Sequence, residues 1–266
     1  MKLLCPICGE TLDRIEKHYR CGNGHSFDLA RQGYVNLLPV QQKRSLNPGD
    51  TREQVLGRRA FLDTGCYEPI SNTLNETAKE LGAIGPILDV GCGEGYYSAR
   101  LAEALGAELT GLDISKEAVR CAAARYKGPQ WLCGTAAHLP VESGSAGVVT
   151  SLFALTMAEE FKRVLRPDGY FFQVLAAEDH LLGLKSIIYP ELKFKEKNTV
   201  PEVPGFELVK SVPIRFTFTV EGEQVQNLLG MTPHVFRITK EGAARLAATE
   251  TLTDTASAVL NVYRVV

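Results

Sequence analysis

The chain has 266 residues, of which 45% are hydrophobic and 23% charged, and its formal net charge is −2. This length leaves room for one large and one small domain, and the composition is ordinary for a soluble globular protein. No apolar run approaches the roughly 20 residues of a membrane helix, and the N-terminus lacks a signal-peptide pattern, so we expect a cytoplasmic protein with no membrane partner.

Four residues near the start of the chain have the spacing of a zinc site: Cys5, Cys8, Cys21 and His25. The pattern Cys-x2-Cys-x12-Cys-x3-His offers three thiolates and one imidazole, which form a closed tetrahedral set for zinc. Because no coordination position stays open, we expect the Zn²⁺ to be structural. Residues 1–36 are then expected to form a small zinc-ribbon-like domain, whose core is too small to fold without the metal.

A connector and a helix are expected over residues 37–68. Asp50 or Thr51 can cap a helix that runs to Asp63. Residues 1–66 hold ten Lys and Arg against seven Asp and Glu, whereas the rest of the chain is acidic. A solvated surface would explain this basic excess, and so would contact with an anionic partner. The residues that we expect at such a contact are Arg31, Lys43, Arg44, Arg52, Arg58 and Arg59.

From residue 69 onward, helical and β-prone runs alternate. Helices are predicted near 70–82, 95–105, 115–126 and 157–165, and strands near 86–90, 108–112, 130–133, 146–153 and 169–175. This alternation predicts a mostly parallel sheet between layers of helices. The β-prone stretches 206–220 and 257–266 indicate a terminal antiparallel hairpin, with helical segments near 221–229 and 239–248 between them. We therefore expect an α/β, Rossmann-like domain over residues 69–266.

A glycine-rich turn follows the first strand of this domain and precedes a helix. Glycines at a helix N-terminus let the backbone approach a ligand closely. The pattern Asp-x-Gly-x-Gly-x-Gly differs from the G-x-G-x-x-G spacing of dinucleotide folds, and an acid ends the next strand, where it can accept hydrogen bonds from ribose hydroxyls. Both details favour S-adenosylmethionine. The residues expected to hold it are Asp89, Gly91, Gly93, Glu94, Gly95 and Asp113, with Thr135 near the adenine.

Beyond these separate motifs, the whole chain resembles one family. The zinc knuckle, Gly33-Tyr-Val-Asn-Leu-Leu-Pro39, Arg59-Ala-Phe-Leu-Asp63 and the glycine turn are together similar to the bacterial 23S rRNA guanine-N1 methyltransferases. The resemblance implies a class I methyltransferase domain, a zinc domain that recognises an rRNA hairpin, and a homodimer. By matching position it also implies four further cofactor contacts, Tyr67, Tyr97, Ser98 and His180.

One segment departs from the family pattern, which usually has an aromatic-x-Pro motif after the fourth strand, facing the target base. Phe153 keeps the aromatic position here, but Leu155 replaces the proline. We expect the base to flip out of the RNA and to stack on Phe153, with Tyr34 as a second stacking face. His138 is the side chain that we name as a candidate general base, and Glu178 and His180 are weaker ones.

Two alternatives stay open beside methyl transfer to N1 of a guanine in a 23S rRNA hairpin. A small-molecule methyltransferase that retained the zinc knuckle would explain Leu155 and the sequence pI of about 6.2, and it predicts turnover without RNA. A binding protein with an inert Rossmann domain predicts no affinity for S-adenosylmethionine. The intact glycine turn and the acids Asp89 and Asp113 argue against that second alternative.

Overall fold

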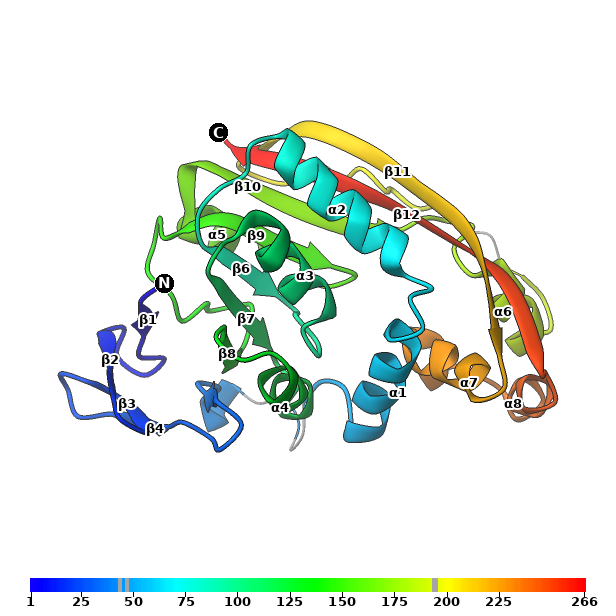
Figure 1. Ribbon diagram of the computed structural model, residues 1–266, viewed down its shortest axis with the longest axis horizontal. Coiled ribbons are helices and arrows are strands. Elements are labelled where there is room, and N and C mark those ends of the chain that lie inside the picture. The colour runs from blue at the N-terminus through cyan, green and yellow to red at the C-terminus, as the bar shows by residue number, and fades with distance from the viewer. Residues whose placement is uncertain (43–44, 46–47, 193–195) are drawn as a thin grey trace.

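Two sheets organise the chain in a computed structural model that describes residues 1–42, 45, 48–192 and 196–266 (Figure 1). The small N-terminal sheet has the order β1-β2-β3-β4, formed by β1 (Leu3–Leu4), β2 (Thr11–Ile15), β3 (His18–Cys21) and β4 (Ser26–Asp28). The large sheet has the order β11-β12-β10-β9-β6-β7-β8-β5. Its strands are β5 (Tyr34–Asn36), β6 (Ile87–Val90), β7 (Leu109–Asp113), β8 (Gln130–Cys133), β9 (Ala146–Leu152), β10 (Leu165–Ala176), β11 (Phe206–Glu221) and β12 (Thr251–Val265).

Strands β5 to β10 pair with one another in parallel, whereas β12 pairs antiparallel with β10 and β11. All residues of β6 and β9 are buried, because parallel strands in a layered fold are covered on both faces. This topology confirms the expected α/β sheet with a terminal antiparallel hairpin. Figure 1 shows that hairpin as a long arch, with α6, α7 and α8 gathered at its far end.

Eight α-helices lie within the described residues, and each begins near its expected position except for one that was not expected. They are α1 (Arg52–Leu62), α2 (Glu68–Glu80), α3 (Tyr96–Leu105), α4 (Lys116–Arg125), α5 (Ala158–Val164), α6 (Leu182–Ile188), α7 (Glu223–Gly230) and α8 (Lys240–Ala247). Thr51 caps α1 in a reciprocal capping box with Gln54. None of the described helices has the length and apolarity that crossing a bilayer requires.

The unexpected helix, α6, depends on a distant residue. Asp254, on β12, accepts hydrogen bonds from the backbone N–H groups of Gly183 (2.9 Å) and Leu184 (2.7 Å). These are orphan donors at the first turn of α6, so the carboxylate caps the helix from another element. A short segment that contains a glycine gives no local signal for such a helix.

The two faces of the large sheet have separate cores. One core contains Ile87 and Val148 from the sheet and is covered by α1 to α4 and by α6 to α8. The other contains Leu88, Val149 and Phe171, with Phe161 of α5 packed against it. The alternation of neighbouring residues between the two cores follows from the two-residue period of a strand.

The small sheet contributes to the second core. Leu3, Leu12 and Tyr19 are buried in the same cluster as the residues of β6 and β9. Leu3 also bridges Val141, and the N–H of Leu4 donates to the carbonyl of Pro140 (2.9 Å). The small module is therefore packed into the body of the protein.

Strand β5 differs from the sequence-based boundary, which placed residues 34–36 in the zinc domain. These residues pair with β8 and extend the large sheet at its edge. Tyr34 and Val35 are consequently buried, one in each of the two cores that cover the faces of the sheet. The segment 37–68 is also more than a linker, since Phe61 and Leu62 of α1 lie in the main core.

Close packing around Trp131 makes one glycine of β7 sensitive to substitution. A Cβ added to Gly111 would lie 2.3 Å from Cζ3 of the buried Trp131 ring. Overpacking of a core typically costs about 1–3 kcal/mol. We therefore expect Gly111→Ala to lower the free energy of unfolding by about that amount in denaturant titrations, whereas Gly230→Ala, which meets open space, stays near wild type.

Candidate functional site

The four expected metal ligands converge at one point of the small sheet. The ligand atoms of Cys5, Cys8, Cys21 and His25 all lie within 4.8 Å of one another. Cys8 Sγ and Cys21 Sγ are 3.7 Å apart, and His25 Nδ1 is 3.4 Å from Cys21 Sγ and 3.6 Å from Cys5 Sγ. Tetrahedral zinc with Zn–S bonds of about 2.3 Å would separate its sulfur ligands by roughly 3.7 Å.

This donor set fits zinc and leaves no coordination position for a substrate. Three soft thiolates and one imidazole select zinc over hard cations such as Mg²⁺ and Ca²⁺. The described cysteines outside the cluster, by contrast, form no such group. The zinc is thus structural, and its ligands come from the Cys5–Cys8 knuckle and from the turn after β3.

The glycine turn between β6 and α3 has the backbone that only glycines adopt readily. Gly91, Gly93 and Gly95 have φ values of 85°, 55° and 87°. A Cβ at Gly95 would meet Trp131 at 2.7 Å, and one at Gly91 would meet the Cβ of Ala154 at 2.6 Å. The turn therefore combines left-handed conformations with close packing, and it leads directly into the N-terminus of α3.

Asp89 lies beneath this turn and is held by two hydroxyl groups. Ser98 donates to one carboxylate oxygen, and Thr150 donates to the other at 2.7 Å. Burial raises the pKa of Asp89 to about 6, against the effect of these two hydrogen bonds. Ser98, which we expected at the cofactor, is buried and bonded to Asp89, so it supports the turn from within. Thr150 was not anticipated, although a polar residue in the apolar strand β9 is a signal.

Asp113 ends β7 beside the turn. Its carboxylate accepts hydrogen bonds from the N–H of Gly93 (2.9 Å) and of Ser115 (2.8 Å). Each oxygen keeps a second lone pair, which suits the two hydroxyls of a ribose. Thr135 lies in the same corner, because the neighbouring Gly134 donates its N–H to the carbonyl of Asp113 (3.0 Å). The acidic and hydroxyl groups expected around a nucleoside are therefore adjacent.

Glu94 and Tyr97 hold buried polar atoms that lack hydrogen-bond partners among the described residues. Neither carboxylate oxygen of Glu94 is hydrogen-bonded, nor is the Tyr97 hydroxyl. Glu94 is 2% exposed, and its nearest countercharge is Arg125 at 3.7 Å. Burial raises the pKa of Glu94 to about 7. Unsatisfied groups beside a glycine cradle fit a polar ligand, and S-adenosylmethionine with its ammonium group and ribose matches this donor and acceptor set.

Tyr67, His180 and Phe153 form a series of rings on the other side of the site. Ser257 N–H donates to Nδ1 of His180 at 3.1 Å, so the proton of the neutral imidazole is on Nε2, which donates to the Tyr67 hydroxyl (3.4 Å). Burial lowers the pKa of His180 to about 4, which keeps the ring neutral. The Phe153 ring lies 6.1 Å from His180 and is 41% exposed, so it offers a face to a ligand.

The expected RNA-binding residues have mixed environments. Arg31 and Arg52 are exposed, whereas Arg58 pairs with Asp50 at 2.5 Å and Arg59 with Asp63 at 3.7 Å. Lys43 and Arg44 lie outside the described residues. Tyr34 is only 5% exposed in β5, so it cannot stack on a base in this structure.

Arg58 lies over the cofactor turn. A Cβ added to Gly93 would be 4.0 Å from Cδ of Arg58. Its partner Asp50 also accepts a hydrogen bond, through its backbone carbonyl, from the Ser115 hydroxyl (2.7 Å). Arg58 of α1 therefore lies against the glycine turn, and Asp50 before that helix contacts Ser115 after β7. Sequence reasoning missed these contacts because the segments are far apart in the chain.

His138 has no described contact with Phe153 or with the glycine turn. The side chain is exposed, and its backbone N–H donates to the carbonyl of Thr135 (3.4 Å). His180 has no nitrogen free to accept a proton, since Nδ1 already accepts and Nε2 donates. The geometry thus gives neither histidine the position of a general base.

Zinc removal is expected to destabilise the whole chain because the small module shares a core with the large sheet. Purified protein should hold one zinc per chain by elemental analysis, and Cys8→Ser should hold far less. We expect the thermal midpoint of that variant to fall by about 10 °C or more, as loss of several kcal/mol implies. Cys121→Ser, outside the cluster, is the control. An unchanged midpoint without zinc would contradict the shared-core argument.

Replacing Glu94 tests the role of a buried carboxylate that has no hydrogen-bond partner among the described residues. Because its pKa is raised in the folded protein, ionisation opposes folding as pH rises from the ordinary value of 4.5 through about 7. Glu94→Gln should therefore stabilise the cofactor-free protein at pH 8 by up to about 3 kcal/mol, and have little effect at pH 4.5. Its affinity for S-adenosylmethionine should fall. The exposed Glu103→Gln serves as control in thermal unfolding and in calorimetric titration.

The comparisons with known proteins cover both parts of the chain. Residues 3–46 match the model of the RlmA N-terminal domain, a zinc ribbon, and residues 88–173 match that of a methyltransferase domain. A solved structure from Anaeromyxobacter dehalogenans that bears the name of a type II methyltransferase has a TM-score of 0.50 at 17% identity, over 71% of this chain and 95% of that one. This likeness shows the class I methyltransferase fold.

Curated relatives of two classes, small-molecule methyltransferases and rRNA methyltransferases, differ in how much of this chain they match. A demethylmenaquinone methyltransferase of Chlorobaculum tepidum is 31% identical over 128 residues, which cover 45% of this chain and 50% of that protein. The 23S rRNA (guanine(748)-N(1))-methyltransferase of Streptomyces fradiae is 33% identical over 254 residues, which cover 92% of this chain and 90% of that protein. Since the similarity to the latter enzyme includes the zinc module, the chain belongs to the family of 23S rRNA (guanine-N1)-methyltransferases.

Proposed function

We propose that this protein transfers the methyl group of S-adenosylmethionine to N1 of a guanine in a hairpin of 23S rRNA. The observation that carries the proposal is the union of a Cys3His zinc module with a class I cofactor site in one packed body, matched along nearly its full length by an enzyme of that name. The similarity to small-molecule methyltransferases, in contrast, covers less than half of the chain.

The bound cofactor would supply a methyl group on a sulfonium, which needs no further activation. As the N1–methyl bond formed, the methyl–sulfur bond would break to leave a neutral thioether, and the N1 proton would pass to water. The task of the chain is then to align acceptor and donor, and alignment alone can account for a large part of a rate acceleration. Asp113 would orient the ribose and the glycine turn the remainder of the cofactor. Phe153 would stack on the flipped guanine. His180 would act indirectly, because its hydrogen bond to Tyr67 fixes the imidazole ring that lies beside Phe153.

RNA contacts are proposed for the exposed arginines of the N-terminal part. Arg31 follows the small sheet and Arg52 begins α1, and both side chains are exposed. Arg58 and Arg59 would first have to leave their partners Asp50 and Asp63. We also propose that the protein is cytoplasmic and that it works as a homodimer. Light scattering in solution would test the dimer. Phosphate contacts predict an RNA affinity that falls steeply with salt.

The proposed reaction is tested with labelled S-adenosylmethionine and two kinds of acceptor. Unmodified 23S rRNA fragments should take up label on N1 of a single guanine. A small-metabolite extract without RNA should take up none. Label in the metabolite extract alone would show that the chain kept the fold and cofactor but acts on another acceptor, in which case the rRNA assignment is wrong.

Removing the aromatic face should slow methyl transfer without affecting the cofactor. Loss of base stacking typically costs about 1–3 kcal/mol. We therefore expect Phe153→Ala to lower kcat/KM for RNA by about tenfold or more, while the Kd of S-adenosylmethionine stays within about twofold. Phe153→Tyr keeps the ring and is the matched control. Equal losses in both variants would exclude stacking as the role of this side chain.

A further inference from the structure

A row of polar side chains crosses the large sheet behind the acceptor loop, defined here as residues 153–157. The pairing register places Ser151, Gln173, Asn261 and Ser211 side by side on β9, β10, β12 and β11. The first three are buried, and Gln173 is only 2% exposed. Buried polar groups persist where hydrogen bonds compensate for lost hydration, so their partners indicate what the row does.

The row is bonded to the acceptor loop at two points. Nε2 of Gln173 donates to Oγ1 of Thr156 at 2.7 Å. The Ser151 hydroxyl donates to the backbone carbonyl of Leu155 at 3.3 Å. Leu155 itself is 78% exposed, so its side chain contributes little packing to the loop. Two hydrogen bonds therefore tie the loop to the sheet, in addition to the packing of Met157 against the second core.

The backbone of this loop needs such support. Phe153 has a left-handed φ of 55°, which a side chain larger than glycine adopts only where the surroundings impose it. Its N–H donates to the carbonyl of Val174 on β10 (2.9 Å). The next residue, Ala154, packs against Gly91 of the cofactor turn. A small displacement of the loop would thus move the Phe153 ring relative to the cofactor site.

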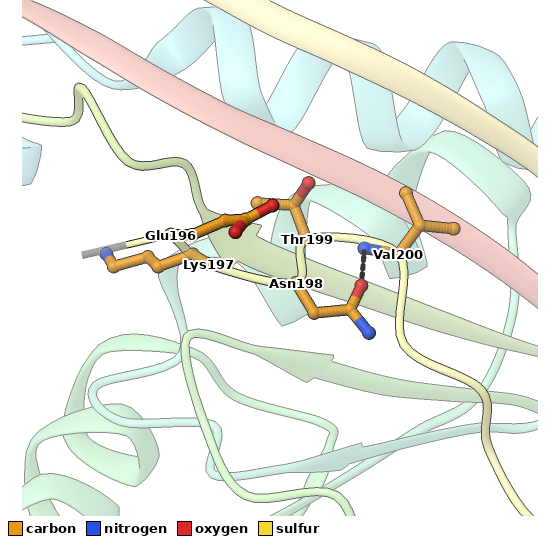
Figure 2. Close-up of a pocket in the computed structure, with 5 residues that line it drawn as sticks. All are labelled: Glu196, Lys197, Asn198, Thr199 and Val200. Atoms are coloured by element: carbon orange, nitrogen blue, oxygen red, sulfur yellow. Dashed lines mark hydrogen bonds between the residues drawn. The ribbon is translucent and has the colours of Figure 1, made fainter.

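The far end of the row fixes the orientation of the Gln173 amide. Nδ2 of Asn261 donates to Oε1 of Gln173 (3.4 Å) and to the carbonyl of Thr199 (2.7 Å), while its Oδ1 accepts from the Ser211 hydroxyl (2.9 Å). Thr199 belongs to residues 196–200, which line a pocket of about 430 Å³ (Figure 2). Because Oε1 of Gln173 accepts the hydrogen bond from Asn261, the N–H groups of the Gln173 amide point toward the acceptor loop.

We propose that Gln173 is a positioning residue, which holds the acceptor loop through Thr156 so that Phe153 faces the base. Gln173 touches neither the base nor the cofactor turn, and it acts only by restricting the backbone of a loop that contains no glycine or proline. The statement that the loop faces a base rests on the proposed function, whereas the restraint on the loop does not.

The test removes the hydrogen bond from either end and reads the loop directly. Gln173→Leu and Thr156→Val should each accelerate amide hydrogen exchange in peptides that cover the acceptor loop, by about tenfold. Each should lower kcat for the methylated acceptor by about tenfold, which corresponds to one hydrogen bond to a neutral partner. The Kd of S-adenosylmethionine should stay within about twofold. Because both variants break the same bond, the double variant should be no slower than either single one.

Two matched variants serve as controls. Thr156→Ser keeps the hydroxyl and should retain wild-type exchange and kcat. Ser211→Ala removes a hydroxyl at the other end of the same row but keeps the contacts of Asn261 with Gln173 and Thr199, so it should leave loop exchange and kcat unchanged. If Gln173→Leu does not fold, Thr156→Val still removes the bond from the loop side, where the side chain is only partly buried.

The outcomes are separable from those of the proposed function. Loop exchange and kcat within about twofold of wild type in Thr156→Val would overturn the proposal, as would losses that multiply in the double variant. A wild-type protein that fails to methylate rRNA would sink the proposed function instead. Hydrogen exchange in the loop, which needs no RNA, would still decide the role of Gln173.

Discussion

The glycine turn and the elements around it depend on the hydrogen bonds of the buried Asp89 carboxylate. Asp89 lies one residue before the end of the central strand β6 and accepts hydrogen bonds from Ser98 of α3 and from Thr150 of β9. One buried group thus joins the strand before the glycine turn, the helix after it and the neighbouring strand. Burial raises its pKa to about 6, and the hydrogen bonds from those two hydroxyls oppose that shift by stabilising the ionised carboxylate.

The close approach of elements around that corner explains why its residues are small. Gly91 leaves room for Ala154 of the acceptor loop, and Gly95 and Gly111 leave room for the Trp131 ring. Acceptor loop, cofactor turn and sheet therefore interlock at van der Waals distance. Because interiors are packed to nearly crystalline density, a shift in one of these elements is transmitted to the others.

The zinc module is part of this body, since Leu3, Leu12 and Tyr19 lie in the core beneath the central strands. The metal orders a small sheet that has little apolar surface of its own, and the sheet in turn covers one face of the large one. This packing fixes the position of the zinc module relative to the methyltransferase domain.

The sequence by itself determined the α/β sheet, the metal set and the glycine turn, because each depends on near-neighbour spacing: the Cys5–Cys8 knuckle, the Gly91–Gly95 turn and the alternation of apolar runs. Only the tertiary structure decided which side chains these elements share. Tyr34 is buried in the core because the edge strand β5 pairs with β8. Gln173 lies next to the acceptor loop because of the register in which β9, β10 and β12 pair. Contacts between residues far apart in the chain are set by side-chain packing and strand pairing, and neither can be read from the local spacing of residue types.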